Sequence, residues 1–285
     1  MTPRPFTSHS YLTTYLDCPR RWRLKYRDGY VPHEKSESVF QAAGKIGHAG
    51  LAAYYSEGDL EAALEEIRKE HTARIPAPEL LGNLDYFTCG HFEVIMHNYA
   101  AQNPLDGIEV LGVEEKIVDT EMRFGGFIDL IARIAGQIEV WDHKFTTKWM
   151  AKLETQHRRS MQIPLYCRLV ERLVGEPVRI GRINGVLMKD NASNASSKAE
   201  KFNRFGADPA QPLFTEYQLE RAESWIGEVE SAIESDETFP MSPGDSCKWC
   251  EFEPVCFART STIAEGMLAT LYHIEPYKSR LEEEG

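Results

Sequence analysis

The chain has 285 residues, a hydrophobic content of 42% and a formal net charge of -12. This length and apolar content support a globular protein with a substantial core, and no stretch approaches the roughly 20 apolar residues of a membrane span. The start, MTPRPFTSHS, lacks an apolar run behind a basic head, so we expect a cytoplasmic location. The acidic balance argues against a protein that coats nucleic acid. It permits a nuclease, since carboxylates that hold a metal ion lower the net charge.

The first hundred residues are predicted to be mainly helical. Two short helices meet at Cys18, with Ser8 or Ser10 as the cap of the first and Pro19 opening the second. Apolar spacing predicts further helices over 39–58, 59–75 and 83–102. Three glycines in the first of these segments would allow close approach of another backbone: Gly44, Gly47 and Gly50.

The middle of the chain changes to short β-branched and aromatic segments. These predict three consecutive antiparallel strands over 108–118, 122–134 and 137–145. A helix over 155–174, a strand over 181–189, a polar loop over 191–204 and a helix near 216–236 follow. Helices after strands predict a mixed α/β fold, with a central mixed sheet flanked by helices.

The chain shows no internal repeat and no clean linker, which favours a single domain over residues 1–285. Within it we expect a helical part, a core and a C-terminal helix followed by a cysteine motif, over 8–105, 106–190 and 214–260.

Acidic residues occur at ordered places in the predicted strands. Glu114, Asp129 and Asp142 each lie on a different strand, and Lys144 follows Asp142 by two residues, which places both on one face. Burying two carboxylates costs several kcal/mol per unpaired ion unless a metal or a cation compensates. Carboxylate oxygens suit Mg²⁺ or Mn²⁺. Any one of these acids alone is better explained as an edge-strand residue paired with Lys144, whereas the whole set favours a site.

These residues carry a resemblance to a known family. The segments GFID at 126–129 and VWDHK at 140–144 resemble the PD-(D/E)XK nucleases. GKIGHAG at 44–50 is similar to the helical histidine motif of the RecB-like branch, and QIPLY at 162–166 to its Q-x-x-x-Y motif. By spacing alone His48 would be a core histidine and Gln162 a helix-surface amide. The resemblance implies a restriction-endonuclease-like core and metal-dependent hydrolysis of a DNA phosphodiester.

The resemblance also implies roles for individual residues. The metal ligands would be His48, Asp129, Asp142 and the backbone carbonyl of His143, with Glu114 assisting the metal or its water. Lys144 would orient the nucleophile and offset charge on phosphorus. Gln162 and Tyr166, one helical turn apart, would face the site; their alternative is helix packing against the sheet.

The cysteines form a second pattern. Six cysteines without an export signal are more readily thiols or metal ligands than disulfides. CPRRW near the start and C-x2-C-x5-C near the end resemble the iron-sulfur subset of RecB-like nucleases, as in the AddB and CRISPR-adaptation types. That resemblance implies a [4Fe-4S] cluster joining the two ends of the chain, held by Cys18, Cys247, Cys250 and Cys256. Zinc is the alternative occupant. Cys89 and Cys167 lack such spacing and are predicted to be buried small hydrophobes.

Basic clusters are candidate DNA contacts, although each is equally explained as a solvated helix face. The residues predicted to contact DNA are Arg20, Arg21, Arg23 and Lys148. The predicted substrate is DNA, as single strands or ends cleaved by an exonuclease. The chain has no G-x-x-x-x-G-K-[ST] motif, so unwinding would need a helicase or a recombination or adaptation partner. The alternatives are an inactive nuclease scaffold that binds DNA and holds zinc, and an iron-sulfur redox protein, for which no flavin or nucleotide signature exists.

Two features depart from the family pattern. Phe145 follows the D-x-K lysine, where the family usually carries a hydroxyl residue, and Thr146 and Thr147 come next. The tail from Thr260 onward has no counterpart in the family. We expect it to form a helix with a frayed acidic end.

Overall fold

The computed structural model describes residues 6–34, 37–75, 87–146, 159–188, 204–205 and 214–282. The chain divides into two compact units. The first comprises Met1–Ser36, Val118–Gly126 and Glu220–Gly285, and the second Glu37–Ile117 and Phe127–Leu219. The single domain expected from the sequence stays a prediction.

Three helices of the second unit follow the predicted order. They are α3 (Val39–Glu57), α4 (Leu60–Arg74) and α5 (Cys89–Gln102). Each begins at a residue whose side-chain oxygen accepts a backbone hydrogen bond: Ser38, Asp59 and Thr88. Residues 83–86 of the predicted third helix lie outside the described part of the chain. No helix among the described residues combines the length and the apolar character needed to cross a membrane.

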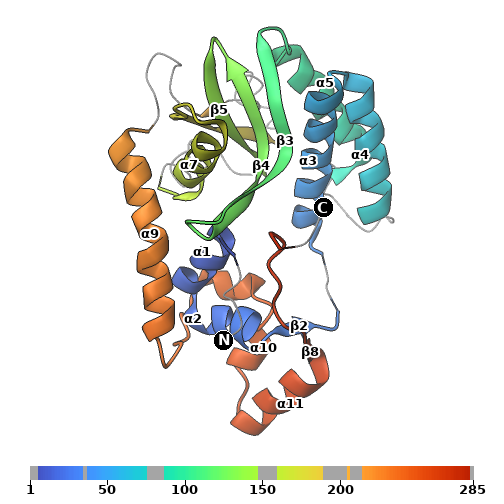
Figure 1. The fold of residues 1–285 in the computed structure, drawn as a ribbon. Helices are drawn as coiled ribbons and strands as arrows, with labels where there is room; N and C mark the ends of the chain where they lie inside the picture. The colour runs from blue at the N-terminus through green and yellow to red at the C-terminus, as the bar shows by residue number, and fades with distance from the viewer. Residues whose placement is uncertain are drawn as a thin grey trace. The chain divides into compact units, whose positions relative to one another are not determined.

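A mixed sheet forms the centre of the second unit (Figure 1). Its strands are β3 (Ile108–Asp119), β4 (Phe124–Ile134), β5 (Gln137–Thr146), β6 (Ile180–Leu187) and β7 (Arg204–Phe205), together with the two-residue β1 (Thr7–Ser8), which pairs parallel with the start of β4. β3 pairs with β4, which is antiparallel to β5, and β5 is parallel to β6, which is antiparallel to β7. Helix α7 (Gln162–Val174) lies between β5 and β6 in the chain, as a parallel crossover requires. The predicted mixed α/β fold is confirmed.

The core of the second unit is formed by the sheet and α3, α4 and α5. Its fully buried side chains include Ile46, Leu51, Phe92, Tyr99 and Trp141. β5 is buried along most of its length, as expected for a strand covered on both faces. Glu139, on this strand, is fully buried because it accepts hydrogen bonds from the Trp141 indole and the Arg182 guanidinium. The burial of this carboxylate is therefore compensated by hydrogen bonds.

The first unit carries short elements from both ends of the chain. From the N-terminal side come β1 (Thr7–Ser8), α1 (His9–Asp17), α2 (Pro19–Trp22), the π-helical turn η1 (Arg23–Arg27) and β2 (Tyr30–Pro32). From the C-terminal side come η4 (Asp245–Trp249), α10 (Glu253–Cys256), α11 (Ser261–Leu271) and β8 (Tyr272–Ile274). Helix α9 (Glu216–Ser235) begins in the second unit and ends in the first. Of the two predicted caps, Ser8 is the one that caps α1.

The C-terminal tail packs onto the N-terminal segment. The predicted helix is present as α11, but it ends at Leu271 and the chain continues as β8, which pairs antiparallel with β2. The Tyr272 hydroxyl donates to the carbonyl of Glu251 at 2.5 Å. Further along, the ring of Tyr277 packs edge-on against Tyr26 at 4.7 Å. The tail is thus an integral part of the first unit.

Candidate active site

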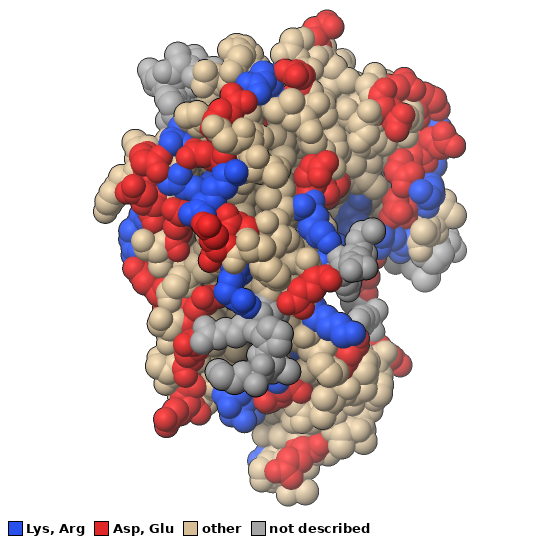
Figure 2. Space-filling view, viewed as in Figure 1, with Lys and Arg blue, Asp and Glu red and all other residues tan. Residues whose placement is uncertain are grey.

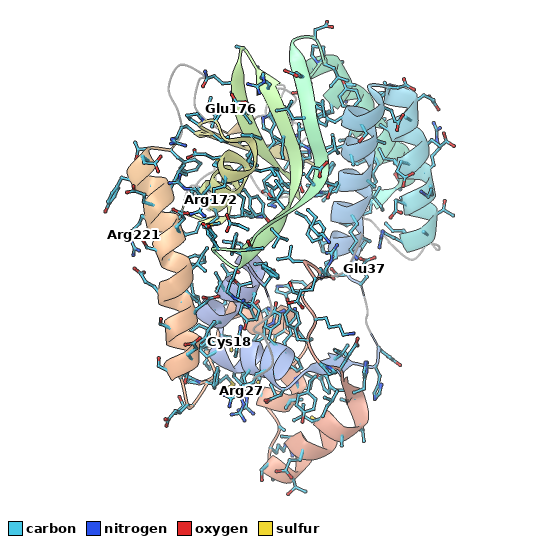
Figure 3. All side chains as sticks on the ribbon, viewed as in Figure 1. Cys18, Arg27, Glu37, Arg172, Glu176 and Arg221 are labelled. Atoms are coloured by element: carbon cyan, nitrogen blue, oxygen red, sulfur yellow. The ribbon has the colours of Figure 1, made fainter. Side chains whose placement is uncertain are left out.

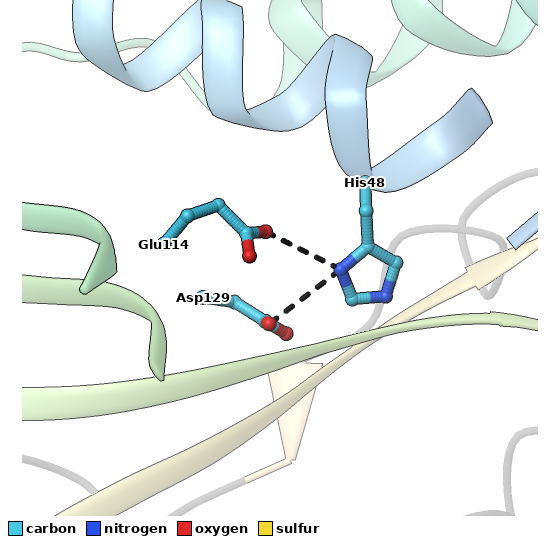
Figure 4. Close-up of side chains that lie close together, drawn as sticks. All are labelled: His48, Glu114 and Asp129. Carbon is cyan, nitrogen blue, oxygen red and sulfur yellow. Dashed lines mark ion pairs between the residues drawn. The ribbon is translucent and has the colours of Figure 1, made fainter. Parts of the chain in front are cut away.

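Three predicted site residues from separate elements meet at one point. His48 comes from α3, Glu114 from β3 and Asp129 from β4 (Figure 4). The His48 Nδ1 atom lies 3.5 Å from Asp129 Oδ1 and 3.6 Å from Glu114 Oε1. One ligand atom from each residue lies within 4.8 Å of the others, which is close enough to share one ion. One nitrogen and two carboxylate groups form a donor set that suits Mn²⁺ or Mg²⁺.

The backbone at Glu114 has an unusual conformation. This residue lies inside β3 with a φ of 50°, in the left-handed region that non-glycine residues seldom adopt. Glu114, Glu115 and Lys116 are all exposed, so the usual alternation of buried and exposed residues stops here. Such irregularities in strands redirect side chains and cluster at functional sites. Here the irregularity accompanies a carboxylate that faces His48.

Asp142 and Lys144 lie together beside this group. The Lys144 Nζ atom donates to Asp142 Oδ1 at 2.7 Å, as their spacing of two on β5 predicts. Asp142 is 3% exposed. From α7, Gln162 Nε2 donates to the same oxygen at 3.3 Å and to the Tyr166 hydroxyl at 3.4 Å. The Q-x-x-x-Y residues therefore face the carboxylate rather than solvent. Asp142 is not part of the His48 group, so its role as a metal ligand stays a prediction.

His143 contributes to the site through its backbone. Its N–H donates to Asp129 Oδ2 at 2.5 Å, which leaves Oδ1 facing His48. Its side chain is 1% exposed and points to the other face of the strand, where the ring stacks on Tyr55 at an interplanar angle of 11°. The Asn184 Nδ2 atom lies 2.8 Å from His143 Nδ1. The predicted contact of the His143 carbonyl with a metal ion stays a prediction.

Opposite charges determine the protonation of His48 and Asp129. Burial alone disfavours a charged imidazole. The neighbouring carboxylates of Asp129 and Glu114 outweigh burial and raise the pKa of His48 to about 10. Burial likewise opposes ionisation of Asp129, but the contact with His48 lowers the pKa of Asp129 to about 2. Below pH 10 the protonated His48 thus occupies the position of a cation between the two carboxylates.

Burial is the largest influence on the pKa values of Asp142 and Lys144. Burial raises the pKa of Asp142, Asp129 raises it further, and Lys144 opposes both. Burial alone lowers the pKa of Lys144, but the charges of Asp142 and Asp129 outweigh it and raise that pKa. Burial also raises the pKa of Tyr166, and the nearby carboxylates add to the effect. The site therefore gathers the carboxyl groups of Glu114, Asp129 and Asp142 around the cationic side chains of His48 and Lys144.

Two residues that support the site were not identified from the sequence. Asn184 is fully buried on β6, opposite His143 in the strand register, and its side chain also donates to the Tyr99 hydroxyl at 2.7 Å. Tyr55 stacks on the same histidine from α3. A polar residue inside the apolar strand GRINGVLM was the available signal, because a buried amide requires partners.

The four cysteines of the predicted cluster all belong to the first unit (Figure 3 labels Cys18). Burial raises the pKa of Cys256, Arg20 opposes it, and the charges of Cys18 and Cys247 raise it further. Cys256 in turn contributes to the raised pKa of Cys250, after burial. Yet no three of these described sulfurs lie within 4.8 Å of one another. A tetrahedral zinc ion would hold its sulfurs at about 3.8 Å from one another. The four sulfurs are therefore not as close together as a single zinc ion would hold them.

The basic residues predicted to contact DNA are largely paired. Arg21 forms an ion pair with Glu251 at 2.7 Å, and Arg23 with Asp28 at 3.2 Å. Lys148 lies outside the described residues. On the face drawn in Figure 2, basic and acidic side chains are interspersed rather than gathered in one basic band. DNA contact by these residues stays a prediction.

Comparisons with known proteins relate this chain to one family. Residues 7–257 match the family model of the PD-(D/E)XK nuclease superfamily, a range that includes every residue of the site. Among solved structures, the chain is similar to the crystal structure of SSO0001, at 16% sequence identity and a TM-score of 0.32, over 88% of this chain and 95% of that one. A search of curated proteins finds no match. The mixed sheet flanked by helices is consistent with the restriction-endonuclease-like fold of that superfamily.

Proposed function

We propose that this chain, which belongs to the PD-(D/E)XK nuclease superfamily, is a metal-dependent nuclease. It would hydrolyse phosphodiester bonds in DNA. The observation that carries this proposal is the meeting of His48, Glu114 and Asp129 beside the Asp142–Lys144 pair. These side chains come from distant stretches of the chain, and a metal ion would bind the two carboxylates in place of the His48 proton.

The ligand set follows from the donors present. His48, Glu114 and Asp129 would hold Mg²⁺ or Mn²⁺, with Asp142 and the carbonyl oxygen of His143 completing the set. Such an ion supplies a water ligand of lowered pKa and offsets charge on the scissile phosphate. The His143 N–H keeps Asp129 Oδ2 engaged, so that Oδ1 remains directed at the ion position.

The remaining residues would orient the nucleophile and substrate. Lys144, whose amine is held at Asp142, would orient the attacking water and stabilise charge that develops on phosphorus. Gln162 donates to Asp142 and to Tyr166, so it would fix the direction in which that carboxylate is presented. Removal of the Gln162 amide would loosen the Asp142–Lys144 pair rather than remove a ligand.

The finer assignment is a RecB-like exonuclease that acts on single-stranded DNA or DNA ends. The G-K-I-G-H-A-G and Q-I-P-L-Y segments support this branch, and the lack of a P-loop motif in the sequence assigns unwinding to a helicase or recombination partner. An inactive DNA-binding scaffold is the alternative. The complete set of His48, Asp129, Asp142 and Lys144 argues against it, since a retired site gains stability by losing buried charges.

We also propose that Cys18, Cys247, Cys250 and Cys256 hold a [4Fe-4S] cluster. The charges of Cys18 and Cys247 raise the pKa of Cys256, and that of Cys256 raises the pKa of Cys250, which supports the proposal that the four thiols act together. Their sulfurs are farther apart than a single zinc ion requires. In a [4Fe-4S] cluster each thiolate binds its own iron, whereas a zinc ion would bind all four thiolates itself. The cluster would link the two ends of the chain.

Anaerobic purification tests the cluster. We expect a brown protein with broad visible absorption and about four irons per chain, and Cys256→Ser should lose both colour and iron. Cys89→Ser, which changes a cysteine of the second unit, should keep them. A colourless wild-type protein that contains zinc would reject the iron assignment.

Incubation with end-labelled DNA tests the nuclease. We expect cleavage of single-stranded DNA or of duplex ends in Mn²⁺ or Mg²⁺, and none after chelation of the metal, because the carboxylates alone do not lower the pKa of water. Product lengths distinguish stepwise removal of nucleotides from internal cuts. DNA binding without cleavage in either metal would instead support the inactive scaffold.

A further inference from the structure

The His48 imidazole lies near two aromatic rings of β5. The ring of Phe145 lies 6.2 Å from it at an interplanar angle of 48°, and the ring of His143 lies 6.2 Å from it at 63°. These two residues alternate with Asp142 and Lys144 along the strand, so they belong to its other face. One strand thus provides both the Asp142–Lys144 pair and two rings that lie 6.2 Å from the His48 ring.

The residue before His48 has to be glycine for this arrangement. A Cβ atom at Gly47 would lie 2.4 Å from three atoms at the end of the Phe145 ring, far below any ordinary contact distance. The Phe145 ring therefore rests directly on the backbone of α3, one residue from the histidine. Gly44, one turn earlier on the same helix, has no atom within 4 Å of the corresponding position. The close contact is thus specific to Gly47.

Both rings are held by other parts of the second unit. His143 is fixed by the Asn184 amide at 2.8 Å and by its stack on Tyr55. Phe145 packs against the buried core of this unit. Both rings therefore have fixed surroundings, and the centre of each lies 6.2 Å from that of the His48 ring. Groups that orient a metal ligand in this way affect metal affinity without touching the metal.

We propose that Gly47 and Phe145 are positioning residues that set the distance between α3 and β5 and so direct His48 Nδ1 toward Glu114 and Asp129. This inference rests on the proposed function, in which His48 is a metal ligand. It assigns a role to Phe145, the residue that replaces the hydroxyl side chain usual at this place in the family. The apolar ring acts by packing, where a hydroxyl would act by hydrogen bonding.

The test compares two glycine substitutions on one helix. Gly47→Ala and Gly44→Ala make the same chemical change and gain the same helix propensity, so a difference between them reports the contact with Phe145. Equilibrium binding of Mn²⁺ is measured by isothermal titration calorimetry without DNA, and folding by thermal unfolding. We expect Gly47→Ala to bind Mn²⁺ about 10- to 100-fold more weakly, as other changes behind a metal ligand do. Gly44→Ala should stay within about twofold of wild type.

Phe145→Ala, alone and combined with Gly47→Ala, gives a double-mutant cycle. Alone it should weaken Mn²⁺ binding about tenfold by freeing His48. In that background Gly47→Ala should add less than about a twofold effect, because the ring it would strike is gone. If Gly47→Ala does not fold, Phe145→Ala alone decides. Unchanged affinity in Phe145→Ala, or a Gly47→Ala penalty that persists in the Phe145→Ala background, overturns the inference. A wild-type protein that binds no Mn²⁺ would instead reject the proposed metal site itself.

Discussion

Asp129→Asn should reduce DNA cleavage by about a thousandfold or more while the protein still folds, because the change removes one negative metal ligand and keeps the shape of the side chain. The amide oxygen can still accept from the His143 N–H, which donates to Asp129 Oδ2 in the wild type. What is lost is the charge that faces His48. The unfolding temperature should fall by no more than about 2 °C, the shift that roughly 1 kcal/mol produces in a chain of this size.

Metal-dependent stabilisation provides the second measurement. Mn²⁺ should raise the unfolding temperature of the wild type, since an ion that binds only the folded state stabilises it. It should leave that of Asp129→Asn almost unchanged. Asp106→Asn is the matched control: it makes the same change at an exposed aspartate in the turn before β3, and it should retain both activity and metal response. Near-wild-type cleavage by Asp129→Asn would remove this residue from the mechanism.

Lys144→Met should lose cleavage to a similar extent and should also lose stability. The substitution keeps the apolar stem but leaves Asp142, which is 3% exposed, without its cation. Removing one partner of a buried pair costs about 3–5 kcal/mol. Because the Lys144 side chain is 30% exposed, water reduces that cost, and we expect a loss of roughly 1–3 kcal/mol at pH 7 to 8.

The pH dependence of this loss has a definite sign. Burial raises the pKa of Asp142, so the folded state binds a proton to this group more readily than the unfolded state does. Without Lys144 the penalty for the ionised carboxylate is largest above the raised pKa. It should shrink as the pH falls toward the ordinary aspartate value near 4. Denaturant unfolding of Lys144→Met at pH 5 and pH 8 measures this directly.

Two further variants separate charge from packing. Asp142→Asn in the Lys144→Met background should recover most of the lost stability but no activity, because it removes the unpaired charge and not the chemistry lost with Lys144. Lys69→Met is the control, since Lys69 pairs with Glu66 on the exposed surface of α4 and such pairs contribute less than about 1 kcal/mol. A stability loss in Lys144→Met that is equal at both pH values would contradict the role of the Asp142 charge.

The parts of the site that depend on local periodicity could be predicted from the sequence. The shared face of Asp142 and Lys144 follows from their spacing of two on a strand, and the approach of Gln162 to Tyr166 from a spacing of four on a helix. The mixed α/β fold follows from the order of strand and helix patterns. These features depend on a few neighbouring residues, and tertiary packing did not alter them.

Other parts depend on contacts between distant segments and could not be predicted. No local pattern indicates that Glu114 adopts a φ of 50° or that its carboxylate meets His48 while Asp142 pairs elsewhere. The ring of Phe145 was identified as a departure from the family, but its contact with Gly47 depends on how closely α3 approaches β5. Sequence spacing likewise did not fix the separation of the cysteine sulfurs.

The position of β8, the last strand, has a consequence for truncation of this protein. The family match stops at residue 257, whereas β8 pairs with β2 and the backbone of Glu275 closes on Gly29, where any side chain would strike its carbonyl oxygen at 2.5 Å. A chain trimmed where the similarity ends would leave the edge of β2 bare and the rings of Tyr11 and Tyr26 without their cover. The family match and the packed unit therefore end at different residues of this polypeptide.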